Sequence, residues 1–145
     1  MSIPTILVIE DNVADRELLR YALDDLGEPY HFEVLADGEA ALAFIDDHRC
    51  GRRKNDPCII LLDLHLPKYN GIEVLAAIRE EPVLNHIQVF ILTSDASPAE
   101  RARIAALGAV CCFKPSDLAA IKALAADILV ACKETGRRLS TTAPG

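Results

Sequence analysis

A run of five apolar residues that ends in an aspartate constrains this chain most. Residues 58–62, Cys-Ile-Ile-Leu-Leu, lead directly into Asp63, and Pro67 and Gly71 follow within eight positions. A short apolar run bounded by turn residues is typical of a strand buried on both faces, as in a parallel sheet. Asp63 is then either a carboxylate at the carboxyl end of a central strand, where open α/β sheets bind ligands, or the cap of the next helix. The stretch by itself does not decide between the two.

Segments with strand character alternate with segments of helical periodicity five times along the chain, with short connections. The expected strands are residues 5–9, 30–36, 58–62, 87–92 and 110–113. The expected helices are residues 13–26, a segment after Asp37 and Gly38, a segment between Gly71 and Pro82, residues 98–107, and a final helix from about residue 117 to Gly136. The inward face of the first helix is expected to carry Leu18, Leu19, Ala22, Leu23 and Leu26. This order predicts one α/β domain, residues 1–136, with helices on both faces of a parallel sheet, followed by a mobile tail, residues 137–145.

The charge and composition of the chain exclude several classes of function. Its 145 residues carry a net charge of −7 and give a pI near 5.0, whereas non-specific binding to nucleic acids requires a basic surface. No apolar run approaches the roughly 20 residues that span a bilayer, and the N-terminal residues lack a secretory signal. We therefore expect a cytoplasmic protein without direct contact to DNA or membrane.

The five cysteines are odd in number and lie mostly in apolar contexts; they are Cys50, Cys58, Cys111, Cys112 and Cys132. Free cysteine behaves as a small buried hydrophobe, so we expect thiols in a reducing compartment rather than disulfides. Cys111 and Cys112 are adjacent and should face opposite sides of a strand, which argues against a metal site built from them.

The carboxyl ends of four expected strands each carry residues able to take part in ionic chemistry. They are Glu10 and Asp11, Asp63, Thr93, and Lys114. In a parallel sheet these ends share one edge, so residues far apart in the sequence come together there. Each residue alone could be a helix cap or a surface charge, but the complete set at four strand ends is much less expected by chance.

Three carboxylates at one edge require a compensating positive charge. At about 5 Å each pair repels by roughly 3 kcal/mol at an effective dielectric of 20, so the cluster must share protons, pair with a cation or bind a metal. Hard oxygen ligands favour Mg²⁺ or Mn²⁺. With Lys114 and the Thr93 hydroxyl, this edge is suited to stabilising a phosphoryl group during in-line transfer. The expected nucleophile is Asp63, with Glu10 and Asp11 holding the metal.

This set resembles the receiver domains of two-component response regulators. The matching pieces are Glu10-Asp11, Asp63 with Leu66-Pro67 and Gly71, Thr93-Ser94, and Lys114-Pro115, and the resemblance covers residues 5 to about 134. It implies a doubly wound, flavodoxin-like (βα)5 fold with the strand order 2-1-3-4-5. It also implies a signalling protein rather than an enzyme, with weak self-phosphorylation and autodephosphorylation.

By this resemblance, Asp63 accepts a phosphoryl group from a phosphohistidine on a sensor histidine kinase. The resemblance places Mg²⁺ on Asp11, Asp63 and the backbone carbonyl of His65, with Glu10 assisting through a water molecule. These roles are expectations for the positions that match the family motif.

The same resemblance assigns movements and modulating roles to residues around Asp63. Thr93 is expected to swing toward the phosphoryl oxygens, and Lys114 to pair with them next to a cis peptide bond to Pro115. His65 and Asp95 lie two residues beyond Asp63 and Thr93, where the family controls attack of water on the acyl phosphate. We expect them to tune the lifetime of the phosphoryl group, and a solvent-facing His65 without a special role is the alternative.

One position departs from the family pattern. Most receivers carry an aromatic residue three positions before the lysine, and here Cys111 stands there. Phe113 directly precedes the lysine, and we do not expect it to replace the usual aromatic, because neighbouring residues in a strand face opposite ways.

The chain resembles one subgroup of the family in the residues from Asp63 to Lys68, in Gly71 and in the long basic loop before Cys58. These are stand-alone regulators that work with bacterial and cyanobacterial phytochromes, which are red-light-sensing histidine kinases. The resemblance implies a phytochrome kinase that docks on the first helix and the loop after Lys114, with output through protein–protein contacts. A homodimer through the fourth helix, fifth strand and fifth helix is a further expectation.

Two other functions remain open from the sequence. A haloacid-dehalogenase-like phosphatase also passes through an aspartyl phosphate, but it needs a second acid two residues after the nucleophile, where this chain has His65. A pseudo-receiver would be a pure interaction module that is never phosphorylated, and the complete set of acids, threonine and lysine argues against it.

Overall fold

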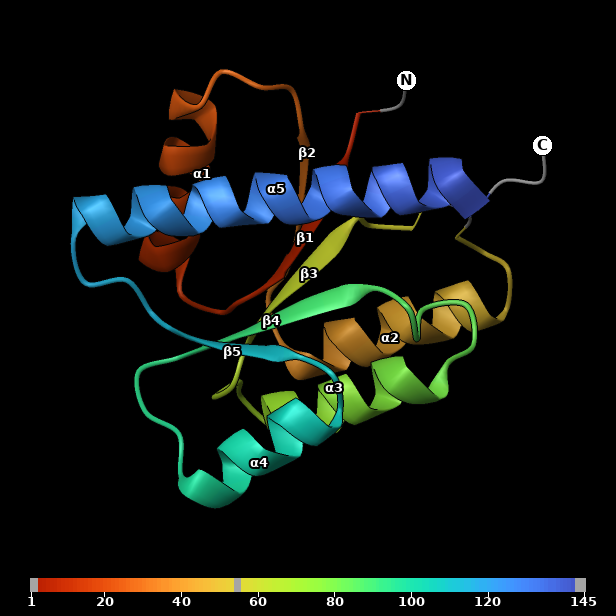
Figure 1. Ribbon diagram of the computed structural model, residues 1–145. Helices are drawn as coiled ribbons and strands as arrows, with labels where there is room; N and C mark the ends of the chain where they lie inside the picture. Colours follow the sequence, from red (N-terminus) through yellow and green to blue (C-terminus); the bar gives the residue numbers. More distant parts are fainter. Residues whose placement is uncertain (1–2, 54–55, 143–145) are drawn as a thin grey trace.

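The protein, described by a computed structural model over residues 3–53 and 56–142, is a five-stranded parallel sheet with helices on both faces (Figure 1). The strand order is β2-β1-β3-β4-β5, so the predicted doubly wound, flavodoxin-like fold is confirmed. The strands are β1 Thr5–Ile9, β2 His31–Leu35, β3 Ile59–Asp63, β4 Gln88–Thr93 and β5 Val110–Phe113. The helices are α1 Val13–Asp25, α2 Gly38–Arg49, α3 Gly71–Glu80, α4 Pro98–Ala106 and α5 Leu118–Thr142. Within these residues no helix is both long and apolar enough to span a bilayer.

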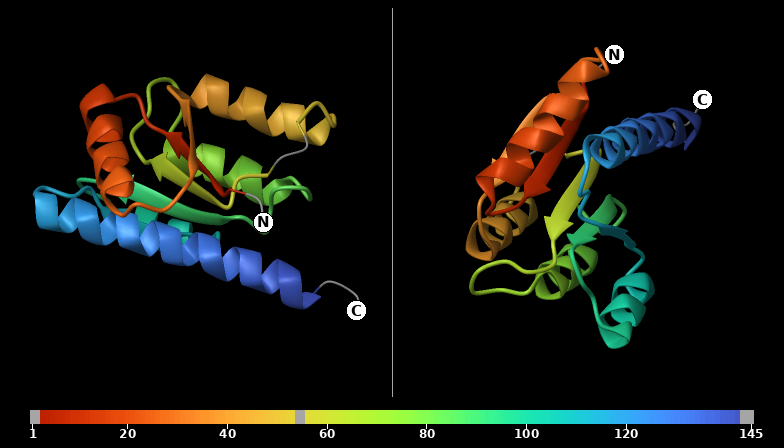
Figure 2. Two further views of the ribbon diagram at one scale, coloured as in Figure 1. Left: turned by 90° about the horizontal axis from the view of Figure 1, so that it is seen from above. Right: turned by 90° about the vertical axis from the view of Figure 1, so that its left-hand side faces the viewer.

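Two hydrophobic layers fill the space on either side of the sheet. Alternate side chains of a strand point to opposite faces. In β1, Ile6 and Val8 pack with α1 and α5 in one layer, while Leu7 and Ile9 pack with α2, α3 and α4 in the other. Figure 2 shows α1 and α5 together on one side of the sheet. The sheet is therefore covered on both faces, as the continuous apolar strands predict.

The central strand β3 settles the choice between the two interpretations of Asp63. All five residues of β3 are buried, and Asp63 is the last of them, with an exposed fraction of 3%. The cap of the following helix is Asn70, whose side chain accepts a hydrogen bond from the backbone nitrogen of Ile72 at 2.8 Å. The helix-cap interpretation of Asp63 is therefore wrong.

Two details of the helices differ from the sequence prediction. Leu18 in α1 and Leu26, the residue that caps the end of this helix, are 51% and 40% exposed, although helical spacing placed them on the inward face. Helix α5 continues to Thr142 instead of ending near Gly136. A single glycine costs a helix only about 1 kcal/mol, which is too little to end it. Residues 137–142 are thus helical, while residues 143–145 of the expected tail lie outside the described residues.

A disulfide contradicts the expectation that every cysteine is a thiol. Cys58, just before β3, is bonded to Cys132 in α5, and their Cα atoms are 5.1 Å apart. The remaining cysteines Cys50, Cys111 and Cys112 are free, as expected. The error has a physical source: the two bonded residues are 74 positions apart, and only the packing of α5 against the sheet brings them together.

Reduction of this bond should destabilise the fold. A crosslink that closes a long loop removes conformational freedom from the unfolded chain, which stabilises the native state by about 2–4 kcal/mol. We expect dithiothreitol to lower the free energy of unfolding in urea by this amount. The double variant Cys58→Ser/Cys132→Ala should show the lower stability with and without dithiothreitol, and equal stability of the oxidised and reduced wild type would contradict the prediction.

Candidate functional site

The parallel register of the sheet brings the predicted site residues to one edge. Asp63 pairs with Leu92 in β4, and Thr93 pairs with Phe113 in β5. One step further along, the backbone nitrogen of Lys114 donates to the carbonyl of Thr93 at 2.9 Å. Consecutive strand ends therefore present an acid, a hydroxyl and an amine in the order that the sequence predicted.

The predicted carboxylate cluster is present at this edge. Glu10, Asp11 and Asp63 each offer a carboxylate oxygen, and these oxygens lie within 4.8 Å of one another. Glu10 and Asp63 are buried, whereas Asp11 is exposed. Hard oxygen donors with one side open to water suit Mg²⁺, which binds few carboxylates and keeps several waters. The donor set therefore fits the predicted metal, and the predicted ligation by the backbone carbonyl of His65 stays a prediction.

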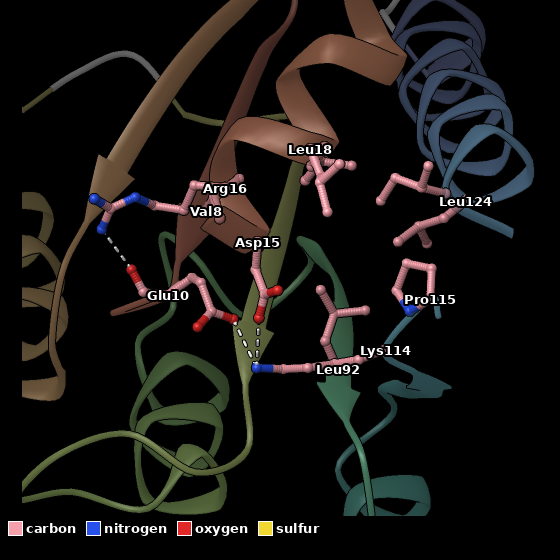
Figure 3. A pocket seen from close by; sticks show the side chains of 11 residues that line it. Val8, Glu10, Asp15, Arg16, Leu18, Leu92, Lys114, Pro115 and Leu124 are labelled. Atoms are coloured by element: carbon pink, nitrogen blue, oxygen red, sulfur yellow. Dashed lines mark hydrogen bonds and ion pairs between the residues drawn. The ribbon is translucent and has the colours of Figure 1, made fainter. Parts of the chain in front are cut away.

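Lys114 is the positive charge at this edge, and Figure 3 shows its ammonium group between Glu10 and Asp15. Its ammonium nitrogen lies 3.2 Å from Glu10 Oε2, 3.2 Å from Asp15 Oδ2 and 3.3 Å from Asp63 Oδ2. Burial by itself lowers the pKa of Lys114, but the charges of Asp63 and Glu10 and the hydrogen bond to Asp15 outweigh burial and hold that pKa above its usual value. Lys114 is therefore a permanent cation in the site.

Glu10 is the carboxylate that is most strongly perturbed. Burial raises the pKa of Glu10 to about 7, assisted by the nearby Asp63 charge, while the hydrogen bond from the Asn12 backbone and the charge of Lys114 act in the opposite direction. The Asn12 nitrogen donates to Glu10 Oε1 at 3.0 Å. Without a further cation nearby, Glu10 therefore gains or loses its proton close to neutral pH.

Both carboxylate oxygens of Asp63 have a donor. The backbone nitrogen of His65 donates to Oδ1 at 3.2 Å, and Lys114 donates to Oδ2 at 3.3 Å. The chain then turns back through Pro67, and the nitrogen of Gly71 donates to the carbonyl of Leu64 at 2.8 Å. A Cβ atom at Gly71 would lie 2.5 Å from the Asp63 carbonyl oxygen. Only glycine allows this close approach, which fixes the backbone of Asp63.

Thr93, His65 and Asp95 form a connected group beside Asp63. The Thr93 side chain is buried, and its hydroxyl donates to the Asp95 carbonyl and accepts from the Asp95 nitrogen at 3.1 Å. The exposed ring of His65 has Nε2 3.2 Å from Asp95 Oδ1. The two predicted modulators therefore contact each other, which the sequence did not reveal, and the Thr93 hydroxyl is held by the Asp95 backbone.

Strand β5 and its end correct two expectations. Cys111 and Phe113 are both exposed, while Cys112 between them packs against the α1–α5 layer. Phe113 is two residues from Cys111 and therefore lies on the same face of β5. The expectation that Phe113 and Cys111 face opposite sides of the strand was wrong. Its ring stacks with Arg101 of α4, with 5.2 Å from the guanidinium carbon to the ring centroid. The peptide bond from Lys114 to Pro115 is trans, not cis as the resemblance implied.

Asp15 is a site residue that sequence reasoning missed. It lies in the first turn of α1, where its backbone nitrogen donates to the side chain of Asn12 at 3.1 Å. The capping residue three positions earlier was the available signal, because it fixes the orientation of the first turn. Beside Asp15, α1 and α5 leave an apolar pocket lined by residues such as Leu18, Pro115 and Leu124 (Figure 3).

The close approach at Gly71 leads to a test of the loop after β3. We expect Gly71→Ala to lower the free energy of unfolding by about 1–3 kcal/mol, because the added methyl group pushes the backbone of Asp63 and Leu64 away from residue 71. Mg²⁺ affinity, measured by calorimetry, should fall as well. Gly51→Ala is the control: it has a positive φ but no atom within 4 Å of its Cβ position, so it should lose stability without a change in Mg²⁺ affinity. Wild-type stability and affinity in Gly71→Ala would contradict this account.

The raised pKa of Glu10 predicts a pH dependence of stability. The unfolded chain releases this proton near pH 4.5 and the folded, metal-free protein only near pH 7. Glu10 therefore lowers the free energy of unfolding as the pH rises from 4.5 to 7, by up to roughly 3 kcal/mol. We expect Glu10→Gln to gain stability relative to the wild type across this range in urea titrations with EDTA. Parallel pH profiles of the two proteins would rule this out.

Comparison with known proteins agrees with this geometry. The profile of the response regulator receiver domain family matches residues 6–126. Response regulator Rcp1 of Synechocystis sp. (strain ATCC 27184 / PCC 6803 / Kazusa) is 40% identical over 89 residues, which cover 61% of this chain and 60% of Rcp1. The chain thus aligns with less than two thirds of the length of this relative.

Two solved structures share the fold at similar identity. The phosphorylated cyanobacterial phytochrome response regulator RcpA has a TM-score of 0.77 and 30% identity, over 88% of this chain and 91% of that one. The Mn²⁺-bound form of Rcp1 has a TM-score of 0.75 and 32% identity, over 86% and 91%. The family match contains every strand end that carries a site residue, and the chain belongs to the response regulator receiver domain family.

Proposed function

We propose that this chain is a phosphorylation-controlled signalling switch whose phosphoacceptor is Asp63. The observation that carries the proposal is the setting of this one carboxylate: it is buried, has donors on both oxygens from His65 and Lys114, and lies at an open depression lined by Glu10 and Asp11. A carboxylate held in this way is oriented for attack and surrounded by groups that stabilise negative charge.

The reaction is an in-line phosphoryl transfer. An oxygen of Asp63 forms a bond to phosphorus while the phosphorus–nitrogen bond of a kinase phosphohistidine breaks, and the imidazole leaves with the electron pair and takes up a proton. Lys114 stabilises the charge that develops on the phosphoryl oxygens. The Thr93 hydroxyl would exchange its Asp95 partner for a phosphoryl oxygen, because the two acceptors compete for one donor. His65 and Asp95, which contact each other at the mouth of the site, would tune the attack of water.

Glu10, Asp11 and Asp63 would hold the Mg²⁺, directly or through water. The ion supplies positive charge between the carboxylates and the phosphoryl group. Support comes from the three oxygens within 4.8 Å and from the similar protein Rcp1, whose structure is a Mn²⁺-bound form. The weak self-phosphorylation and autodephosphorylation expected of such a site need no further residues.

The proposed phosphodonor is a phytochrome histidine kinase in the cytoplasm. The similarity to the phytochrome response regulator RcpA supports this choice. The proposed docking surface is the outer side of α1 with the loop after Lys114, where Val13 and Leu18 are 59% and 51% exposed beside the apolar pocket. Apolar side chains exposed in a group are typical of a protein contact.

The proposed output is a change in protein–protein contacts at the surface of α4, β5 and α5. Val110 and Phe113 are 45% and 65% exposed on β5, and Leu118 is 52% exposed at the start of α5. Phe113 pairs with Thr93 in the sheet register, so a movement of Thr93 would reach this surface through the neighbouring strand. A second copy of the chain is the proposed occupant, and the acidic chain is not proposed to bind DNA or membrane.

The decisive experiment is phosphorylation by acetyl phosphate with Mg²⁺, followed by intact mass. We expect a gain of one phosphoryl group that disappears in Asp63→Asn and in EDTA, because the acceptor or the metal is then missing. Asp127→Asn changes an exposed carboxylate of α5 and should be phosphorylated like the wild type.

Other outcomes would select another function. No adduct on the wild type would favour the pseudo-receiver, and rapid turnover of varied phosphomonoesters would favour the phosphatase. Transfer from a phosphorylated phytochrome kinase that is no faster than from an unrelated histidine kinase would remove the phytochrome assignment and leave the receiver chemistry intact.

A further inference from the structure

The ammonium group of Lys114 is shared by three carboxylates: it donates hydrogen bonds to Asp15 and Asp63 and forms an ion pair with Glu10. A lysine side chain has three N–H groups, and three carboxylates lie within 3.3 Å of its nitrogen: Glu10, Asp15 and Asp63. Two of these acids stand at strand ends in the proposed phosphorylation site, whereas Asp15 comes from α1 (Figure 3). A phosphoryl oxygen that binds Lys114 therefore competes with these carboxylates for its N–H groups.

The three partners differ in how easily they can be released. The side chains of Glu10 and Asp63 are 4% exposed, but that of Asp15 is 41% exposed. A released Glu10 would be a buried carboxylate without its cation, which is costly. A released Asp15 would be solvated by water at little cost. Asp63 itself carries the incoming phosphoryl group, so of the two other partners the exposed one on α1, Asp15, is the one that the new anion displaces.

The geometry points to Asp15 as a positioning residue that competes with the phosphoryl group on Asp63 for Lys114. In the unphosphorylated protein, Asp15 ties α1 to the end of β5 through Lys114. Phosphorylation draws Lys114 to the new anion and frees Asp15. This inference rests on the proposed function of Asp63 and adds a residue, and a route to α1, that the site motif does not contain.

The first turn of α1 is built to hold this contact. Asn12 caps the helix and binds the backbone of Asp15, and the next residue, Arg16, donates from Nη1 to the Glu10 carbonyl at 2.8 Å (Figure 3). The backbone of the turn is thus anchored independently of Lys114, so loss of the Asp15 contact changes the link between α1 and β5 and leaves the helix start in place. Leu18 on this helix and Pro115 next to Lys114 line the same pocket. Release of Asp15 from Lys114 would therefore take place beside the proposed docking surface for the kinase.

The test compares rates of phosphorylation by acetyl phosphate at saturating Mg²⁺. We expect Asp15→Asn to be phosphorylated about two- to fivefold faster than the wild type, the range that corresponds to the loss of one partly exposed ion pair. Glu17→Gln is the matched control, because it removes the same charge from an exposed position of the same helix and should keep the wild-type rate. Asp15→Glu, which retains a carboxylate, should return the rate toward the wild-type value.

The direction of the change separates competition from a structural role. If Asp15 only supported the fold, or only held Lys114 in place, Asp15→Asn would be phosphorylated more slowly than Glu17→Gln. If the two variants were phosphorylated at the same rate, the loss of one negative charge from α1 would explain the result without any competition for Lys114. Either result overturns the inference while wild-type phosphorylation continues. Absence of any adduct on the wild type would instead refute the proposed function on which the inference depends.

Discussion

The contact between Lys114 and the buried carboxylates is the interaction on which the site depends. Glu10 and Asp63 are each only 3% exposed, and two adjacent buried charges of one sign would not be tolerated without a cation. Lys114 reaches both, and the pKa of Glu10 is still raised, mainly because Glu10 is buried and to a lesser extent because Asp63 is close. Lys114 therefore stabilises this edge of the sheet, and the proposed Mg²⁺ would add a second cation there.

The sheet makes this arrangement possible because parallel strands end at the same edge. Asp63 is set by β3, which is buried on both faces, and its backbone is fixed by the close approach of Gly71. Lys114 is set by β5, a strand whose residues are mostly exposed. A rigid carboxylate on a central strand thus faces a lysine on an edge strand, where a displacement disturbs less packing. This asymmetry suits the proposed switch, which must transmit a local change to the surface.

The family similarity and the geometry support different parts of the interpretation. Membership in the receiver domain family follows from the match over residues 6–126. The specific features of this chain come from its own contacts: the pairing of His65 with Asp95, the stacking of Phe113 with Arg101, and Asp15 on Lys114. These contacts come from the tertiary structure of this chain, and all of them lie at or beside the same edge of the sheet.

The sequence by itself determined the order of elements, the strand bounds to within one residue, and which charged and polar residues lie at the strand ends, because apolar runs and the turns after them are local signals. It did not determine contacts between distant elements. The Cys58–Cys132 bond, the exposure of Leu18 and the reach of Asp15 to Lys114 depend on how α1 and α5 pack together beside the sheet. Periodicity shows which side of a helix is apolar, but the neighbouring helix decides how much of that side is covered. For this reason the proposed acceptor Asp63 could be named from the sequence, whereas the contact of Asp15 with Lys114 required the tertiary structure.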